Sequence, residues 1–284
     1  MLRFVPVEFL DFLGKNSIEE VQRGDRTDLV LTVQFSDVRS FTTITEKLSP
    51  GETFDLVGDY LERVCKPVSA HNGFVDKYIG DAVMALFLSA DEAMKSCLEQ
   101  LSALDATNEQ RVEKGEISFE VGFGLHTGPV TLGTVGSTER IDCTVLGDSV
   151  NLASRIESLT VRYGTRLLVS SSVVDALSSP GDYELREVDR VVVKGKTEPV
   201  RLFEVIDALP AERRVQRMAA LQSFSAARDA LFEGRFEAAC ELFEGASQAD
   251  PGDLATELLW KRAWELREAG ATGSSAAVAK LVKK

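Results

Sequence analysis

The stretch LVLTVQFSDV, residues 29–38, is an almost uncharged run that ends beside a carboxylate. Every second position from Leu29 to Phe35 is apolar, and β-branched residues are frequent, which indicates a β-strand. Asp37 follows directly on the apolar part of this run. We therefore predict a strand that delivers one carboxylate to the end of a sheet.

A helix is predicted after this strand. Ser49 suits the N-cap, Pro50 suits the first helical position, and Glu52 completes a capping box. Apolar residues then recur at spacings of three and four over 54–68, and Asn-Gly at 72–73 ends the pattern. This predicts an amphipathic helix that packs against the sheet.

A β-hairpin is predicted next, because FVDKYI and AVMALFL flank a Gly80-Asp81 turn. A second helix over about 90–112, further strands, and a helix that opens at Gly147 follow along the chain. The order β-α-β-β-α-β with additions predicts an α+β fold with helices on a mainly antiparallel sheet.

Charge and composition exclude some partners. The 284 residues carry 32 Lys and Arg against 45 Asp and Glu, a net charge of -13. Proteins that bind nucleic-acid polymers usually present a basic surface to the phosphates, so DNA and RNA are disfavoured. We find no apolar window of the ~18 residues that a membrane span needs. The four scattered cysteines favour reduced thiols and a cytoplasmic location.

The chain divides into a helical lead-in over 1–27, a main domain over 28–208 and a helical extension over 209–284. Within the extension, Ala239, Phe243, Ala246 and Pro251 have the spacing of one tetratricopeptide-like unit. Such units normally stack at least three deep. We therefore favour a helical appendage on the main domain or on a dimer partner.

Asp37 and Asp81 are candidate metal ligands. If the hairpin pairs beside the first strand, both carboxylates reach the same end of the sheet. Mg²⁺ and Mn²⁺ bind proteins through one or two carboxylates and take substrate phosphates as further ligands. The alternative is a simple turn residue and a simple strand-end charge, and for the pair in isolation that alternative is favoured.

Asn151 and Arg155 are spaced i, i+4 near the start of the last predicted helix of the main domain, so they project from one face. An amide and a guanidinium at such a place could bind a ribose oxygen and phosphate charge. A solvated helix face would show the same pattern.

Five ordered motifs make the sequence resemble the catalytic domain of class III nucleotide cyclases over about 28–207. They are QFSDVRSFT (34–42), DKYIGDAVMALF (76–87), GLHTGPVTLGTVG (124–136), TVLGDSVNLASRIE (144–157) and VKGKTEPVRLFEV (193–205). The resemblance implies a palm-like, ferredoxin-like α+β domain that works as a homodimer with active sites at the subunit interface.

The resemblance also implies a set of ligands for two divalent metal ions, Mg²⁺ or Mn²⁺. Asp37, Asp81 and the Val38 carbonyl would hold the ions. Asn151 and Arg155 would come from the other subunit and stabilise the transition state. Two further residues would contact the substrate phosphates, Lys194 at the terminal phosphates and Arg166 at the leaving group.

The choice of purine is implied by two positions. Lys77 matches the base-selecting lysine of the family, and Thr144 takes the second selector position. Adenine offers an acceptor at ring N1 and a donor at its 6-amino group, so a Lys donor and a Thr acceptor predict ATP. Guanylate cyclases place Glu and typically Cys at these two positions. Cys143 should face away from the site because neighbours on a strand alternate.

Thr at the second selector position resembles the subclass that includes bicarbonate-responsive adenylate cyclases. A response to bicarbonate is therefore a hypothesis, and unchanged activity on adding bicarbonate at fixed pH would refute it.

The predicted function is therefore an adenylate cyclase that forms 3′,5′-cyclic AMP and pyrophosphate for cyclic-nucleotide signalling. The alternatives are a guanylate cyclase, a catalytically weak cyclase fold that serves as an ATP-binding regulatory module, and a scaffold built on the helical extension. The lead-in resembles the segment that joins bacterial cyclase domains to an upstream sensor domain.

Overall fold

A computed structural model describes residues 7–137, 141–193 and 198–281. The chain forms two compact units. The first runs to Glu157 and takes in Ser172–Ser178, and the second holds Ser158–Ser171 and the chain from Ser179 onward. These units do not follow the boundaries drawn at 28 and 208 from the sequence, and that division stays a prediction.

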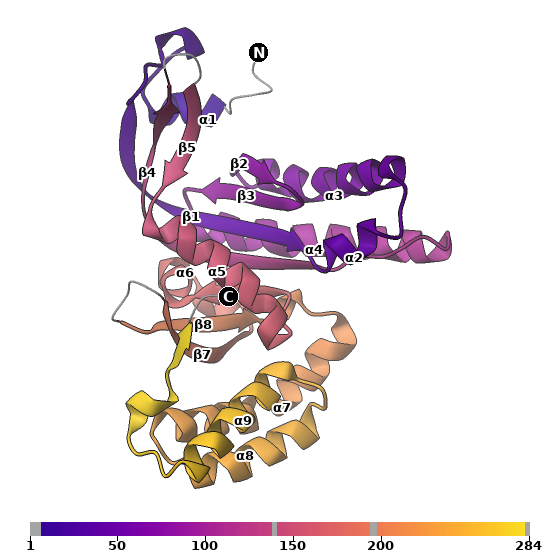
Figure 1. Cartoon of the computed structure of the whole chain (residues 1–284), viewed down its shortest axis with the longest axis vertical. Helices are drawn as coiled ribbons and strands as arrows, with labels where there is room; N and C mark the ends of the chain where they lie inside the picture. Colours follow the sequence, from indigo (N-terminus) through magenta and orange to yellow (C-terminus); the bar gives the residue numbers. More distant parts are fainter. Residues whose placement is uncertain (1–6, 138–140, 194–197, 282–284) are drawn as a thin grey trace. The chain divides into compact units, whose positions relative to one another are not determined.

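The first unit is built on an antiparallel sheet in the order β2-β3-β1-β4, with β5 paired to β4 (Figure 1). The strands are β1 (Arg26–Val38), β2 (Phe74–Ile79), β3 (Ala82–Phe87), β4 (Val121–Gly136) and β5 (Ile141–Leu146). The long strands β1 and β4 pair over their whole shared length, from Arg26 opposite Gly133 to Val38 opposite Val121. The mainly antiparallel α+β fold predicted from the sequence is confirmed.

The hairpin forms where the sequence predicted it. Ile79 pairs with Ala82, so Gly80 and Asp81 make the two-residue turn. Gly80 has a φ of 67°, in the left-handed region that glycine enters without the steric cost that a Cβ imposes. Strand β2 carries one β-bulge, because the register shifts between Val75 and Lys77.

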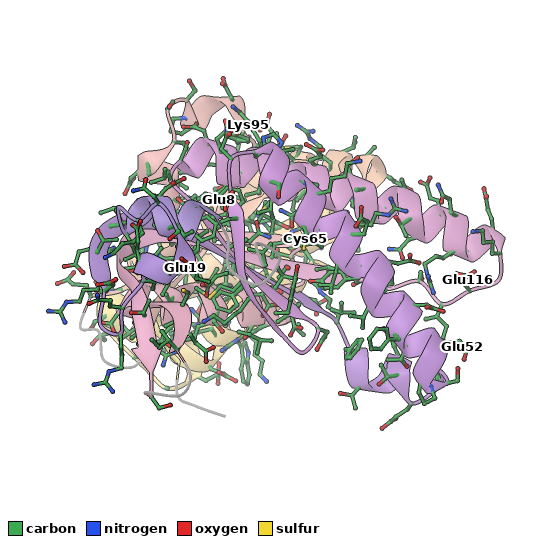
Figure 2. The ribbon with its side chains drawn as sticks, turned by 90° about the horizontal axis from the view of Figure 1, so that it is seen from above. Glu8, Glu19, Glu52, Cys65, Lys95 and Glu116 are labelled. Atoms are coloured by element: carbon green, nitrogen blue, oxygen red, sulfur yellow. The ribbon has the colours of Figure 1, made fainter. Side chains whose placement is uncertain are left out.

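Helices α3 (Pro50–Ala70) and α4 (Ala90–Glu113) lie together against one face of this sheet (Figure 2). The predicted capping box is present: the Ser49 hydroxyl accepts from the Glu52 amide, and the Glu52 carboxylate accepts from the Ser49 amide. Buried polar pairs join these helices to β1. Gln34 and Gln100 exchange amide hydrogen bonds, and Ser36 lies 3.0 Å from the Tyr60 hydroxyl.

The opposite face of β1 carries the apolar core. Leu31, Val33 and Phe35 are buried there with residues from the neighbouring strands. Phe9 on the short helix α1 (Val7–Phe12) and Ala153 on α5 (Asp148–Tyr163) belong to the same cluster. The alternation predicted for residues 29–35 therefore separates an apolar face from a face that carries polar pairs.

The second unit holds the remaining strands of the sheet and three long helices. Its strands run in the order β6-β8-β7-β9, antiparallel except that β9 is parallel to β7. They are β6 (Leu167–Ser170), β7 (Leu185–Val193), β8 (Val200–Val205) and β9 (Ala279–Leu281). The long helices are α7 (Ala211–Phe232), α8 (Phe236–Ala249) and α9 (Leu254–Glu268). Two further short helices, besides α1, are α2 (Phe41–Thr45) and α6 (Ser171–Ala176).

A buried ion network joins the helices of the second unit to strands β7 and β8. Arg186 on β7 and Glu204 on β8 are 1% and 0% exposed and form an ion pair at 2.7 Å. Arg186 also binds Asp253, at 2.6 Å, and Arg217 on α7 binds Glu204 and Asp250. Because isolated buried charges are strongly unfavourable, these residues depend on one another. The contacts hold α7 and the start of α9 against strands β7 and β8.

Among the residues that the structure describes, no helix combines the length and apolar character needed to cross a membrane.

Candidate functional site

Asp37 and Asp81 meet at one end of the sheet. Asp37 is the last residue but one of β1, and Asp81 occupies the hairpin turn before β3, which pairs directly with β1. Burial, a side-chain hydrogen bond with Asp81 and repulsion from its charge together raise the pKa of Asp37 to about 7. The structure therefore brings the two carboxylates together at one end of the sheet, as predicted.

This carboxylate pair fits a divalent cation. Two carboxyl groups in contact must share a proton or a cation, because their like charges repel. Oxygen donors of this kind suit Mg²⁺ and Mn²⁺. In the described part of the chain, no group of three or more His, Cys, Asp and Glu side chains could hold a metal. Any ion here would therefore need ligands beyond the two carboxylates, such as backbone, water or substrate oxygens.

Val38 follows Asp37 and has a buried side chain. Its backbone pairs with Val121 at the end of the β1–β4 ladder. The role of its carbonyl as a metal ligand stays a prediction.

Lys77 and Thr144 come together from the two outer strands of the first unit. The Lys77 ammonium on β2 donates a hydrogen bond to the Thr144 hydroxyl on β5, over 2.5 Å. Cys143 and Val145, on either side of Thr144, pack against the apolar cluster. The alternation that set Cys143 apart from the selector position is therefore present.

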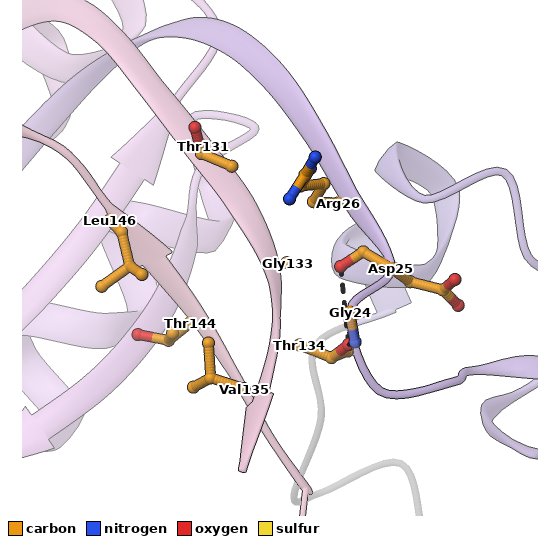
Figure 3. A pocket seen from close by; sticks show the side chains of 9 residues that line it. All are labelled: Gly24, Asp25, Arg26, Thr131, Gly133, Thr134, Val135, Thr144 and Leu146. Carbon is orange, nitrogen blue, oxygen red and sulfur yellow. Dashed lines mark hydrogen bonds between the residues drawn. The ribbon is translucent and has the colours of Figure 1, made fainter.

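Thr144 also lines a pocket on the β4–β5 arm (Figure 3). Leu146 lies beside it on β5, and Thr131 and Val135 contribute from β4. The loop before β1 closes the far side, where the Gly24 amide donates to the Thr134 hydroxyl at 3.0 Å. Thr144, the second predicted selector, therefore both contacts Lys77 and lines this pocket.

Asn151 and Arg155 lie in helix α5, four residues apart as predicted, with Asn151 exposed and Arg155 half-buried. The helix lies tight against β4. A Cβ on Gly128 would come within 2.5 Å of the Ser149 hydroxyl, and a Cβ on Gly124 would overlap the backbone of Glu157. Two glycines of β4 therefore set the distance at which α5 carries its amide and guanidinium.

Two predicted residues remain, Lys194 and Arg166. Lys194 lies outside the described residues. Arg166 belongs to the second unit, where its guanidinium donates to the Ala208 carbonyl at 3.1 Å. Their contacts with substrate phosphates stay predictions.

The sequence matches the Adenylate and Guanylate cyclase catalytic domain over residues 25–205. The chain belongs to this family. An adenylate cyclase of Anabaena cylindrica is 42% identical over 210 residues, which cover 72% of this cyclase chain and 42% of that protein. The terminal-differentiation-specific adenylate cyclase of Dictyostelium discoideum is 34% identical over 267 residues, 92% of this chain and 12% of that protein.

Solved structures agree with the family. A bacterial light-regulated adenylyl cyclase superposes with a TM-score of 0.61 and 29% identity, over 70% of this chain and 56% of that one. The guanylyl cyclase Cya2 superposes with a TM-score of 0.55 and 31% identity, over 65% of this chain and 94% of that one. The cyclase chain thus resembles structures whose names give both purine specificities.

The chain spans less than half of the length of the curated relatives reported above. The Dictyostelium match covers so much of this chain that it has to extend past residue 208 into the C-terminal helices. Similarity to a cyclase is therefore not confined to the catalytic domain.

Asp76 was not predicted as a site residue, and it lies directly beside a predicted selector. Its side chain is only 2% exposed and lies 3.1 Å from the Lys77 ammonium. Regular alternation predicts that neighbours on a strand point apart. Only the bulge in β2 places Asp76 beside Lys77, and no residue type in FVDKYI predicts that bulge.

Proposed function

We propose that the protein is an adenylate cyclase that converts ATP to 3′,5′-cyclic AMP and pyrophosphate. The observation that carries this proposal is the contact between Asp37 and Asp81 at the end of β1. A pair of like charges held together at a sheet end is a cost to the fold that a divalent cation offsets. Family membership supports the same reaction class.

Asp37, Asp81 and the Val38 carbonyl would hold the metal ions. When bound, the ions supply positive charge that activates the attacking ribose 3′-hydroxyl and neutralises the phosphate oxygens. Asn151 and Arg155 align the ribose and stabilise charge on the α-phosphate, and Lys194 binds the terminal phosphates. Alignment and charge stabilisation are the main tasks of a protein in phosphoryl transfer.

The preference for adenine is supported by the Lys77–Thr144 contact. An ammonium group has three donors and no acceptor. One of them serves Thr144, so others remain for ring N1 of adenine. The Thr144 hydroxyl oxygen keeps a lone pair for the 6-amino group. Guanine carries a donor at N1, which an ammonium group cannot accept.

The working enzyme in this proposal is a homodimer whose two sites each combine Asp37 and Asp81 of one subunit with Asn151 and Arg155 of the other. Nucleic acid is not a partner in this proposal, since the net charge is -13. ATP can still bind, because metal cations recruited by the carboxylates offset the charge of its phosphates.

The test is a cyclase assay of the purified protein with ATP or GTP and with Mn²⁺ or Mg²⁺, alongside Asp37→Ala. We expect cyclic AMP as the main product and no product from the variant. Cyclic GMP as the main product would favour a guanylate cyclase. Metal-dependent ATP binding without any cyclic product would favour the regulatory module instead.

A further inference from the structure

Asp76 is a buried carboxylate whose partner is the base-selecting lysine of the proposed function. Its Oδ2 atom lies 3.1 Å from the Lys77 ammonium nitrogen. The same oxygen is inaccessible to solvent and has no hydrogen-bond donor in proper geometry. Burial raises the pKa of this carboxyl group, and the Lys77 charge opposes the rise. A buried acceptor of this kind costs stability, which indicates a reason other than packing for its presence.

The bulge in β2 is what brings Asp76 and Lys77 to the same side. Val75 pairs with Ala85 and Lys77 pairs with Met84, so Asp76 is the extra residue of the strand. Without the bulge, two neighbours on a strand would point to opposite faces. Bulges are frequent beside active sites, where they re-aim a side chain. Here the bulge lets a carboxylate and an ammonium group of adjacent residues meet.

Lys77 is thereby held from two directions. Thr144 accepts one of its hydrogens, and Asp76 attracts its charge from the protein interior, while the lysine side chain stays 36% exposed. A lysine side chain has four rotatable bonds and is otherwise mobile. Two fixed partners restrict the ammonium group to one place and leave a donor for a ligand.

We propose that Asp76 is a positioning residue for purine selection: it fixes the Lys77 ammonium beside Thr144, where it can serve ring N1 of adenine. This inference rests on the proposed function. Asp76 acts through Lys77 and does not touch the base, because its side chain is only 2% exposed. A lysine released from Asp76 could swing to the 6-position and donate to the O6 acceptor of guanine. Loss of Asp76 therefore weakens ATP use and relaxes the discrimination against GTP.

The experiment compares Asp76→Asn with the unmodified chain in KM and kcat for ATP and for GTP, with Mn²⁺. Asn keeps the shape of the side chain and removes its charge. We expect the preference for ATP over GTP to fall roughly 10-fold, mostly through a higher KM for ATP. Coupling energies between contacting residues commonly correspond to a change of about this size. A purely structural defect would lower both activities by the same factor, and that outcome would overturn the inference.

A double-mutant cycle with Lys77→Gln keeps the test decisive. If Asp76 acts through Lys77, Asp76→Asn changes the ATP:GTP preference little once Lys77 is replaced. Additive effects of the two changes would contradict the inference. Asp59→Asn is the matched control, because Asp59 pairs with Arg111 at 3.4 Å on the exposed side of α3 and should leave the preference unchanged.

The proposed function can fail separately. If the unmodified chain forms no cyclic nucleotide, the cyclase proposal is wrong. The same variants are then compared in the binding of non-hydrolysable ATP and GTP analogues with Mn²⁺. A reduced ATP:GTP affinity ratio in Asp76→Asn would still support the positioning role, and an unchanged ratio would refute it.

Discussion

Gly124 on β4 lies so close to the backbone of Glu157 on α5 that any Cβ at this position would overlap it. The glycine therefore sets how near the helix comes to the strand. The first turns of the same helix carry Asn151 and Arg155. This contact explains why β4 has a glycine at position 124, and substitutions there can test the position of α5.

We expect Gly124→Ala to displace α5 and to lower kcat by at least 10-fold, because small misplacements of aligned groups cost up to about 100-fold in rate. Overpacking should also lower the free energy of unfolding by about 1–3 kcal/mol. Gly58→Ala is the control, since Gly58 lies in α3 with nothing near its Cβ position. Equal activity of the two variants would show that the contact does not matter.

Sites shared between subunits predict complementation. Asp81→Ala and Asn151→Ala should each be inactive as homodimers. Mixing the two chains should restore activity, because one of the two sites in a mixed dimer then carries no substitution. The assay is cyclic AMP formation after co-refolding or co-expression. Mixed dimers that form but stay inactive would argue against catalysis at the interface.

The carboxylate pair predicts opposite effects on stability and activity. Asp37→Asn removes burial of a charge and its repulsion from Asp81, so the melting temperature without divalent cations should stay equal or rise. Mn²⁺ at 100 times its Kd should stabilise the unmodified chain by about 2.7 kcal/mol. It should have little effect on the variant. Thermal melts with and without Mn²⁺ test this, and equal stabilisation of both chains would place the ion elsewhere.

The buried ion network predicts that the helical extension cannot be removed without damage to the second unit. Arg217→Met removes the buried cation that pairs with both Glu204 and Asp250, and Glu204 then depends on Arg186 alone; this should cost about 3–5 kcal/mol of unfolding free energy. Arg235→Met breaks only an exposed pair with Glu233 and should cost no more than about 1 kcal/mol. Urea denaturation of both variants tests this. Deletion of 212–284 should likewise give an unstable chain.

Acid should weaken the same network. Burial alone raises the pKa of Asp253, but Arg186 and Arg217 reverse this and bring it to about 2. A carboxyl with a lowered pKa stabilises the folded state above its ordinary value of 3.8 and loses that contribution as the pH falls. We expect the unfolding free energy to fall between about pH 4 and pH 2. Asp253→Asn should be less stable at neutral pH and should show a smaller fall; an unchanged pH dependence would contradict this.

The main elements of the fold could be predicted from local sequence. Alternation over residues 29–35, the Ser49 capping box and the Gly80-Asp81 turn each depend on neighbours within a few positions, and each is present. Local patterns could not predict the parallel strand β9, because its pairing with β7 joins residues far apart in the chain. They also could not predict the ion network, because buried and solvated arginines look alike in a sequence.

For the site, the sequence by itself determined which residues are candidates for the chemistry. They are two carboxylates at a strand end and a turn, a lysine and a threonine, and an amide and a guanidinium one helical turn apart. Only the tertiary structure decided which of them meet. Lys77 and Thr144 come from opposite outer strands, and Asp76 joins Lys77 through a bulge. The physical reason is that side-chain identity is local, whereas strand pairing, register and helix packing depend on contacts between distant segments.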